Sequence, residues 1–278
     1  MNPIQAWDIT LTKLTAGYSG LVVLRDVNGC FPAGKISVIL GGSGCGKSTL
    51  LRHILGLNKP VSGSISLGDQ DIASLSGRKL RRFRRQLGVL FQDGALLGSL
   101  TLAENIGLPL KEHTSLSKRE IKDIVLTKLG LVGLAEFAEY YPSQLSGGMR
   151  KRAGLARAIV ADPPILLCDE PTSGLDPINA AHMDNLLKDM NTRLGVTVVV
   201  VSHDLDSLYA VADHVMVLAE GTAAFNGGLE ELKATNDPYL RRFLDRNPSE
   251  EDLAASIPES TPAPIPTPRK PGSPMERA

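Results

Sequence analysis

Cysteine is scarce in this sequence. Its 278 residues include only Cys30, Cys45 and Cys168. These three lie far apart, and none belongs to a short cysteine or histidine spacing of the kind that ligates a metal. The pattern argues against a disulfide framework and favours reduced thiols in a cytosolic protein.

An excess of one charge is also missing. The 30 basic and 30 acidic residues leave a formal net charge of +0. Proteins that hold nucleic acid electrostatically carry clustered excess positive charge. The composition therefore argues against nucleic acid as a partner.

Long apolar runs are absent as well. A run such as "VTVVVV" at 196–201 falls far short of the roughly 20 residues that a membrane helix needs. The start, "MNPIQAWDITLTKL", lacks a basic region followed by an apolar one, so no signal peptide is expected. If this protein works at a membrane, we expect another chain to supply the membrane spans.

What is present is an alternation of β-type and helical segments through about residue 246. This order predicts an α/β domain with a largely parallel sheet. The early runs "WDITLTKL" and "LVVLRDV" alternate in polarity and predict an antiparallel layer, and residues of about 93–161 predict a helical insertion. Four near-continuous apolar runs predict buried strands at 35–40, 87–91, 165–169 and 196–202.

Proline marks a change of composition near the end. Eight of the 18 prolines lie at or after Pro248. A segment of this kind buries too little apolar surface to fold alone. We therefore expect a folded domain over 1–246 and a flexible tail over 247–278, with a short amphipathic helix in "NDPYLRRFLDRNP" just before the tail.

The segment "LGGSGCGKSTLL" at 40–51 matches the pattern G-x-x-x-x-G-K-[ST]. It follows a predicted strand and opens a predicted helix, as a phosphate-binding loop does. Lys47 would neutralise the β- and γ-phosphates, and the Ser48 hydroxyl would reach Mg²⁺. The candidate nucleotide-binding residues here are Gly41, Gly42, Ser43, Gly44, Cys45, Gly46, Lys47, Ser48 and Thr49.

The strand "ILLCDE" ends in two carboxylates, Asp169 and Glu170. Such a pair is often only a helix cap or a solvated turn. Downstream of a phosphate loop, the pair favours a functional interpretation, in which Asp169 holds Mg²⁺ and Glu170 polarises an attacking water.

The segment "LSGG" at 145–148 predicts a helix start that can receive an anion. Serine is a preferred N-cap, and two glycines leave backbone N–H groups uncovered at the positive end of the helix dipole. Four basic residues follow: Arg150, Lys151, Arg152 and Arg157. The residues themselves leave open which anion binds.

Together these motifs resemble the ABC transporter ATPase family, over about residues 8–246. The resemblance implies a P-loop NTPase (RecA-like) core sheet, mostly parallel, with an antiparallel β layer and an inserted helical subdomain. It implies that Tyr18 stacks on adenine and that Gln92 senses Mg²⁺ and contacts the membrane subunit. Asp176 ends the "SGLD" loop, and His203 matches the histidine that touches the γ-phosphate.

The resemblance further implies that two copies of the chain sandwich two ATP molecules. The anion at the 145–148 helix start is then the γ-phosphate of the ATP that the partner copy holds. The residues implied to bind ATP in trans are Ser146, Gly147, Gly148 and Asp176. The implied catalytic residues are Glu170, His203 and Lys47, and the implied ligands of Mg²⁺ are Ser48, Gln92 and Asp169.

One position departs from the common family pattern, because Met149 replaces the usual glutamine after "LSGG". This residue and "FQDGALLGSLTLAENIGLPL" resemble the branch that powers MCE-type lipid transport, which includes the Mla phospholipid systems. That branch implies integral membrane permease subunits, an MCE-domain lipid-binding protein and a small STAS-like regulatory subunit as partners. It places the chain peripherally on the cytoplasmic face of the inner membrane.

Other functions stay open beside this one. An ABC ATPase for another solute or a lipoprotein carries the same motifs. A soluble ABC protein that acts on nucleic acid usually has two cassettes or a long coiled coil, and this chain has one cassette and neither extra feature. A small-molecule kinase would leave "LSGG", "SGLD" and His203 unexplained.

Three further features each allow an ordinary structural interpretation. The six basic residues in eight positions of "GRKLRRFRRQLG" favour a solvated helix face over an anion-binding surface. Apolar residues within 95–100 either join the core or line a groove for a membrane subunit. Four histidines are interpreted as structural: His53, His113, His182 and His214.

Overall fold

The computed structural model describes residues 5–245. The chain divides into two units, Met1–Thr235 and Asn236–Ala278. In the second unit, the described residues form helix α9 (Pro238–Leu244), which is the short helix expected before the tail. The predicted tail over 247–278 lies outside the described residues.

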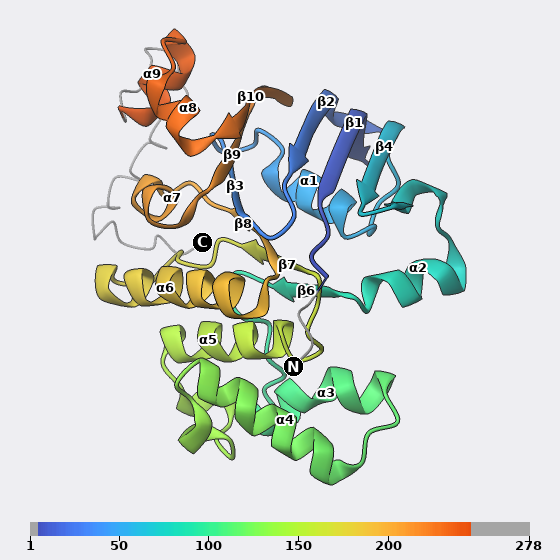
Figure 1. The fold of residues 1–278 in the computed structure, drawn as a ribbon, viewed down its shortest axis with the longest axis vertical. Helices are drawn as coiled ribbons and strands as arrows, with labels where there is room; N and C mark the ends of the chain where they lie inside the picture. Colours follow the sequence, from blue (N-terminus) through green and yellow to red (C-terminus); the bar gives the residue numbers. More distant parts are fainter. Residues whose placement is uncertain (1–4, 246–278) are drawn as a thin grey trace, which may run out of the picture. The chain divides into compact units, whose positions relative to one another are not determined.

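The core of the first unit is a six-stranded sheet with the order β10-β9-β3-β8-β7-β6 (Figure 1). All neighbouring strands are parallel except β10, which pairs antiparallel with β9. The predicted α/β class and the four predicted buried strands are confirmed. The strands are β3 (Ile36–Leu40), β6 (Leu87–Leu90), β7 (Ile165–Asp169), β8 (Thr197–Val201), β9 (His214–Ala219) and β10 (Thr222–Gly228).

The predicted antiparallel layer is also present, as a second sheet with the order β2-β1-β4-β5. Helix α1 (Lys47–Ile54) lies beside it (Figure 1). Leu24 of this sheet, Leu50 of α1 and Val199 of the core sheet belong to one buried apolar cluster. The first turn of α1 is therefore held firmly. The strands are β1 (Ile9–Tyr18), β2 (Leu21–Phe31), β4 (Ser62–Leu67) and β5 (Gln70–Asp71).

Three helices follow β6 and precede β7, where the helical insertion is predicted: α3 (Leu102–His113), α4 (Lys118–Leu131) and α5 (Gly147–Ala158). They lie together in Figure 1. Both α3 and α4 begin with a capping box, in which a hydroxyl and a glutamate satisfy free backbone N–H groups. The other helices are α2 (Gly77–Arg84), α6 (Pro177–Leu194), α7 (Leu205–Val211), α8 (Leu229–Ala234) and the short 3₁₀ turns Ile72–Ser74, Ala135–Phe137 and Pro142–Gln144.

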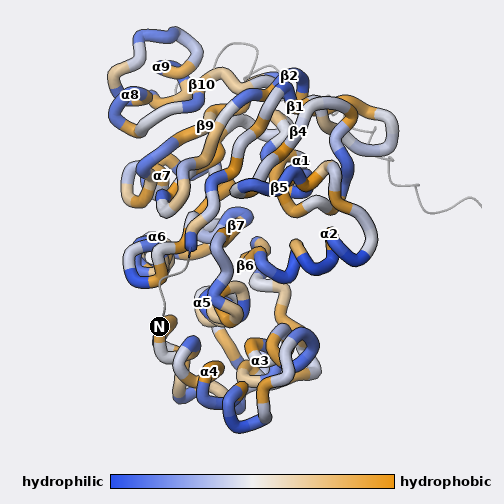
Figure 2. Tube along the Cα trace, turned by 45° about the vertical axis from the view of Figure 1, so that its right-hand side comes forward, coloured by the Kyte–Doolittle hydropathy of each residue, from blue (hydrophilic) through white to orange (hydrophobic). Residues whose placement is uncertain are grey.

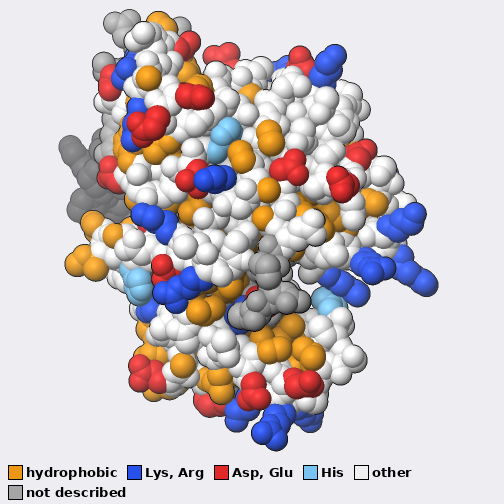
Figure 3. Space-filling view, viewed as in Figure 1, with side chains coloured by type: hydrophobic (Ala, Val, Ile, Leu, Met, Phe, Trp, Pro, Cys, Tyr) orange, Lys and Arg blue, Asp and Glu red, His pale blue; other side chains and the backbone are white. Residues whose placement is uncertain are grey.

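Helix α2 carries the basic run and is mostly hydrophilic (Figure 2). Phe83 is its one buried residue, and its ring stacks on Trp7 with the centroids 6.0 Å apart. Lys and Arg side chains gather on the surface where α2 lies (Figure 3). The arrangement fits the solvated helix face that the sequence favours. Between residues 5 and 245, no helix combines the length and apolarity that crossing a bilayer requires.

Two of the four histidines lie in structural surroundings. His53 is fully buried, and its Nδ1 lies 2.8 Å from the Thr49 carbonyl oxygen. His214 Nε2 lies 3.1 Å from Asn226 Nδ2, and burial lowers the pKa of this histidine. These contacts agree with the structural interpretation.

Asn105 organises the loop that leads from β6 into α3. It is fully buried, and its Oδ1 accepts from Leu97 N at 2.7 Å. Its Nδ2 donates to the carbonyl oxygens of Leu97, Leu100 and Thr101 at 2.9 to 3.1 Å. Because of this frame Leu97 stays 47% exposed, and Ala95 is also exposed. These two residues do not join the core.

Asn105→Leu should destabilise the fold by about 3 kcal/mol, because buried backbone groups of the loop lose their partners while the side-chain volume is kept. At this chain length that corresponds to a midpoint of thermal unfolding roughly 10 °C lower. Glu112→Gln, at an exposed position of the same helix, is the control and should melt like wild type. Equal midpoints for Asn105→Leu and wild type would contradict this role.

Candidate active site

The phosphate-loop motif joins β3 to α1. Gly41 has φ 149° and Gly46 has φ 108°, in a region that favours glycine. A Cβ on Gly46 would also lie 2.5 Å from Leu24 Cδ2. Helix α1 begins after Gly46 without a side-chain cap. Its first N–H groups are therefore available for an anion, and residues 42–44 are exposed.

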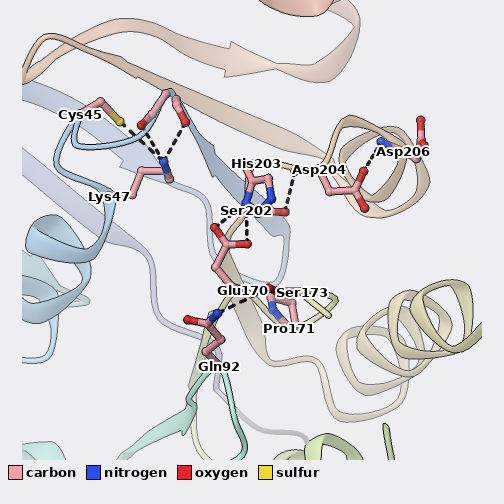
Figure 4. Close-up of polar contacts among 12 residues, drawn as sticks. Cys45, Lys47, Gln92, Glu170, Pro171, Ser173, Ser202, His203, Asp204 and Asp206 are labelled. Atoms are coloured by element: carbon pink, nitrogen blue, oxygen red, sulfur yellow. Dashed lines mark hydrogen bonds and ion pairs between the residues drawn. The ribbon is translucent and has the colours of Figure 1, made fainter. Parts of the chain in front are cut away.

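Lys47 folds back over this loop (Figure 4). Its Nζ donates to the carbonyl oxygens of Gly41 at 2.7 Å and Gly42 at 2.9 Å, and lies 3.9 Å from Cys45 Sγ. The ammonium thus lies at the loop itself, where it can exchange carbonyl partners for phosphate oxygens.

Asp169 ends β7, and its Oδ1 is buried without a hydrogen-bond partner among the described residues. Burial raises the pKa of this carboxyl, and neighbouring Glu170 raises it further, whereas Arg52 and Lys47 lower it. A buried carboxylate oxygen without a partner is costly. A cation at this oxygen would remove that cost.

The residues present fit a Mg²⁺ ion that arrives with a nucleotide. Mg²⁺ prefers oxygen ligands and is usually held by one or two carboxylates together with substrate phosphates. Asp169 offers such an oxygen, and the exposed Ser48 hydroxyl at the start of α1 offers another. Within residues 5–245 no cluster of three or more His, Cys, Asp or Glu side chains forms a separate metal site.

Glu170 has an unusual backbone with φ 49°. A non-glycine residue in this region costs ~1–3 kcal/mol and persists only where its surroundings hold it. Here the Glu170 N–H donates to the Val201 carbonyl at 2.9 Å. His203 Nδ1 lies 2.9 Å from both carboxylate oxygens (Figure 4). The pair joins β7 to the segment after β8, and its carboxylate can accept a proton from water.

Gln92 follows β6, and its Nε2 donates to Ser173 Oγ at 3.5 Å (Figure 4). This contact joins the loop after β6 to the loop after Glu170. Sequence reasoning did not single out Ser173. The sequence feature that could have indicated Ser173 is its position in "PTSGLD", midway between Glu170 and Asp176.

The predicted N-cap of α5 is confirmed, because Ser146 Oγ accepts from Met149 N at 3.2 Å. Asp176 caps α6 in the same manner and also accepts from Asn179 Nδ2, which lowers its pKa. A Cβ on Gly148 would lie 3.5 Å from Asn179 Oδ1. The start of α5 and the start of α6 are therefore neighbours, and Asn179 is a link that sequence reasoning missed.

The basic residues of α5 serve the protein's own backbone. Each donates to at least one backbone carbonyl oxygen, and Arg150 also lies near the helix start, because a Cβ on Gly147 would be 3.9 Å from Arg150 Nη2. The contacts are Arg150 to Leu145, Lys151 to Glu170, Pro171 and Ser173, Arg152 to Val132, and Arg157 to Gly94 and Ala95.

The predicted residues fall into separate groups within one chain. Helix α5 packs on β6 at the edge of the core sheet, whereas α1 packs on the antiparallel sheet and on β7 and β8 of the core sheet (Figure 1). Across the part of the chain that the structure describes, no hydrogen bond or ion pair joins Ser146 or Asp176 to the phosphate loop. Tyr18 lies at the end of β1 and is 51% exposed. The phosphate loop, the starts of α5 and α6, and Tyr18 therefore do not form one closed site within a single copy of the chain.

This fold and this set of motifs define an ATP-binding cassette. Residues 24–173 match the family model of the ABC transporter. The chain belongs to the ABC transporter family. The family resemblance expected from the sequence is thereby confirmed.

Curated relatives lie in the expected branch. The chain is 41% identical over 244 residues to the "Intermembrane phospholipid transport system ATP-binding protein MlaF" of Escherichia coli, covering 88% of this chain and 89% of that protein. It is 44% identical over 237 residues to the "Probable ribonucleotide transport ATP-binding protein mkl" of Mycobacterium tuberculosis, covering 85% of this chain. The match spans 66% of the length of that mycobacterial relative.

Solved structures show the same fold. One is a dimeric structure of the ATP-binding cassette MJ0796 in a post-hydrolysis state, bound to ADP and Pi. It has a TM-score of 0.72 and 34% sequence identity, and the match covers 80% of this chain and 98% of that chain. The P-loop NTPase fold class predicted from the sequence is confirmed.

Proposed function

We propose that the chain is the ATP-hydrolysing motor subunit of an ABC transporter that moves phospholipid between membranes. The Glu170–His203 pair beside the orphaned Asp169 oxygen carries the ATPase part of this proposal. The lipid part rests on the similarity to MlaF, which extends over 89% of that protein.

In the proposed mechanism, the amides of the 41–49 loop and Lys47 bind the β- and γ-phosphates. Asp169, Ser48 and Gln92 would hold Mg²⁺, which would neutralise phosphate charge. Glu170 takes a proton from the attacking water, while His203 holds its carboxylate in place and lies toward the γ-phosphate.

The separation of the site groups within one chain supports a two-copy arrangement. In it, Ser146, Gly147, Gly148 and Asp176 of one copy meet the ATP that the other copy holds, and Tyr18 stacks on adenine in its own copy. Helix amides can bind the second face of a phosphate only after two copies close, so the nucleotide holds the dimer together.

The proposal extends to the surroundings of the motor. Integral membrane permease subunits dock near the exposed Ala95 and Leu97, on the cytoplasmic face of the inner membrane. An MCE-domain protein and a small STAS-like subunit complete the transporter. The proposed cassette spans 1–246, with its helical subdomain at about 93–161.

A second candidate function is transport of another solute, favoured by the name of the mycobacterial relative, which refers to ribonucleotide transport. The test is to purify the chain together with its membrane proteins and to reconstitute the complex into liposomes. We expect ATP-dependent transfer of labelled phospholipid, with Glu170→Gln complexes inactive. ATP-dependent uptake of labelled ribonucleotides without lipid transfer would contradict the lipid assignment and keep the ATPase assignment.

A further inference from the structure

Lys151 makes an unusual set of contacts in the middle of α5. The side chain is only 6% exposed, although lysine is a residue that normally reaches solvent. Its Nζ donates to three carbonyl oxygens in one short segment, at 3.1 Å to Glu170, 3.1 Å to Pro171 and 2.5 Å to Ser173. This segment runs from the proposed catalytic carboxylate toward Asp176.

The chemistry of these contacts leaves Lys151 no donor for a ligand. An ammonium group has three N–H donors, and three backbone oxygens take them. Burial lowers the pKa of Lys151, while the charges of Asp93 and Glu170 raise it. The group is therefore suited to holding backbone in place rather than to binding phosphate.

What Lys151 holds is the strained part of the site. Glu170, with φ 49°, is fixed from three sides: its N–H by Val201, its carboxylate by His203 and its carbonyl by Lys151. The first two contacts come from β8 and the segment after it. Of these three contacts, only the one from Lys151 connects Glu170 to α5.

Lys151 also lies five positions after Ser146 on the same helix. A helix of this length is rigid, so a movement of its N-terminus is transmitted to Lys151. In the two-copy arrangement, Ser146 serves the ATP of one site and Glu170 serves the ATP of the other. The Lys151 contacts join these two ends inside each copy.

We propose that Lys151 is a positioning residue that anchors the strained Glu170 segment to α5, so that the helix start at one ATP site and the catalytic carboxylate of the other site move as one unit. The inference rests on the proposed function, because it assigns Lys151 its effect through Glu170. It accounts for a buried cation that takes no part in the ATP contacts.

The test uses Lys151→Met, which keeps the unbranched stem and removes the three donors. We expect kcat for ATP hydrolysis to fall tenfold or more, while KM stays within twofold, because the phosphate loop is untouched. Arg152→Met is the matched control: this neighbouring, half-buried cation donates to the Val132 carbonyl instead. At equal folded fraction, the control should keep kcat within twofold of wild type, and Lys151→Arg should keep most of it.

A double-mutant cycle separates positioning from a general loss of structure. In single-turnover assays, adding Lys151→Met to Glu170→Gln should cause no further loss, because Lys151 acts through Glu170. An independent, additive loss would overturn the inference, as would Lys151→Met turnover equal to that of Arg152→Met. Glu170→Gln alone is measured first: wild-type turnover there would refute the proposed ATPase site itself, whereas failure of the Lys151 arms alone leaves that site standing.

Discussion

Glu170→Gln is expected to bind ATP with wild-type affinity and to hydrolyse it about a hundredfold more slowly or worse. The amide cannot take the proton from the attacking water, and a positioned general base contributes about that factor. The shape of the side chain and its place against His203 are kept, so the closed dimer should accumulate. Phosphate release and dimer formation by light scattering, both with ATP and Mg²⁺, measure the two effects.

Lys47→Ala is the matched comparison, because it removes the charge at the phosphates and not the base. It should lose ATP binding together with turnover, and it should form no ATP-dependent dimer. The two variants then differ in binding while both are inactive. Wild-type turnover by Glu170→Gln in the assembled transporter would show that another group activates the water.

Ser146→Arg is expected to abolish ATP-driven dimerisation while ATP binding by a single copy persists. Ser146 is exposed at the N-terminus of α5, and among the described residues it makes no hydrogen bond to the phosphate loop of its own chain. A long cationic side chain there would fill the space that the partner's phosphate needs. ATP binding by fluorescence and dimer mass by sedimentation, each with Glu170→Gln as background, separate the two properties.

The control for the lost helix cap is Ser117→Arg. Ser117 is exposed and caps α4 as Ser146 caps α5, but α4 contributes no residue to the proposed site. Both substitutions should cost a similar stability of about 1 kcal/mol, and only Ser146→Arg should block the dimer. If Ser146→Arg lost binding and dimerisation to the same extent, the start of α5 would be part of the fold alone.

The features that sequence predicts well here are made by neighbouring residues. The phosphate loop, its strand and its helix lie within residues 35–54, and the Ser146 cap joins residues three positions apart. Turn chemistry, capping and apolar runs act over such short distances, so the residue types suffice. The parallel sheet is predictable for the same reason, because strands buried on both faces read as continuous apolar runs.

The sequence left two other questions open, because the answers depend on which side chains are exposed. They concern the apolar residues after Gln92 and the basic residues of α5. The apolar residues after Gln92 have the composition of a core segment, and only the frame around Asn105 leaves Ala95 and Leu97 on the surface. The four cations of α5 have the composition of a solvated or anion-binding helix face. The carbonyl partners of Lys151, Arg152 and Arg157 lie 19 or more positions away, in segments that the sequence does not align with the helix.

By itself, then, the sequence determined the nucleotide loop, the acidic end of β7, the capped helix at Ser146 and the family to which they point. Tertiary structure alone decided how these parts are coupled. His203 meets Glu170 across 33 positions and Gln92 meets Ser173 across 81. Lys151 meets Glu170 across 19 positions. These contacts, and the strained backbone of Glu170 that they hold, form because the fold brings segments that are distant in the sequence to one edge of the parallel sheet. No local sequence pattern specifies which residues become neighbours there.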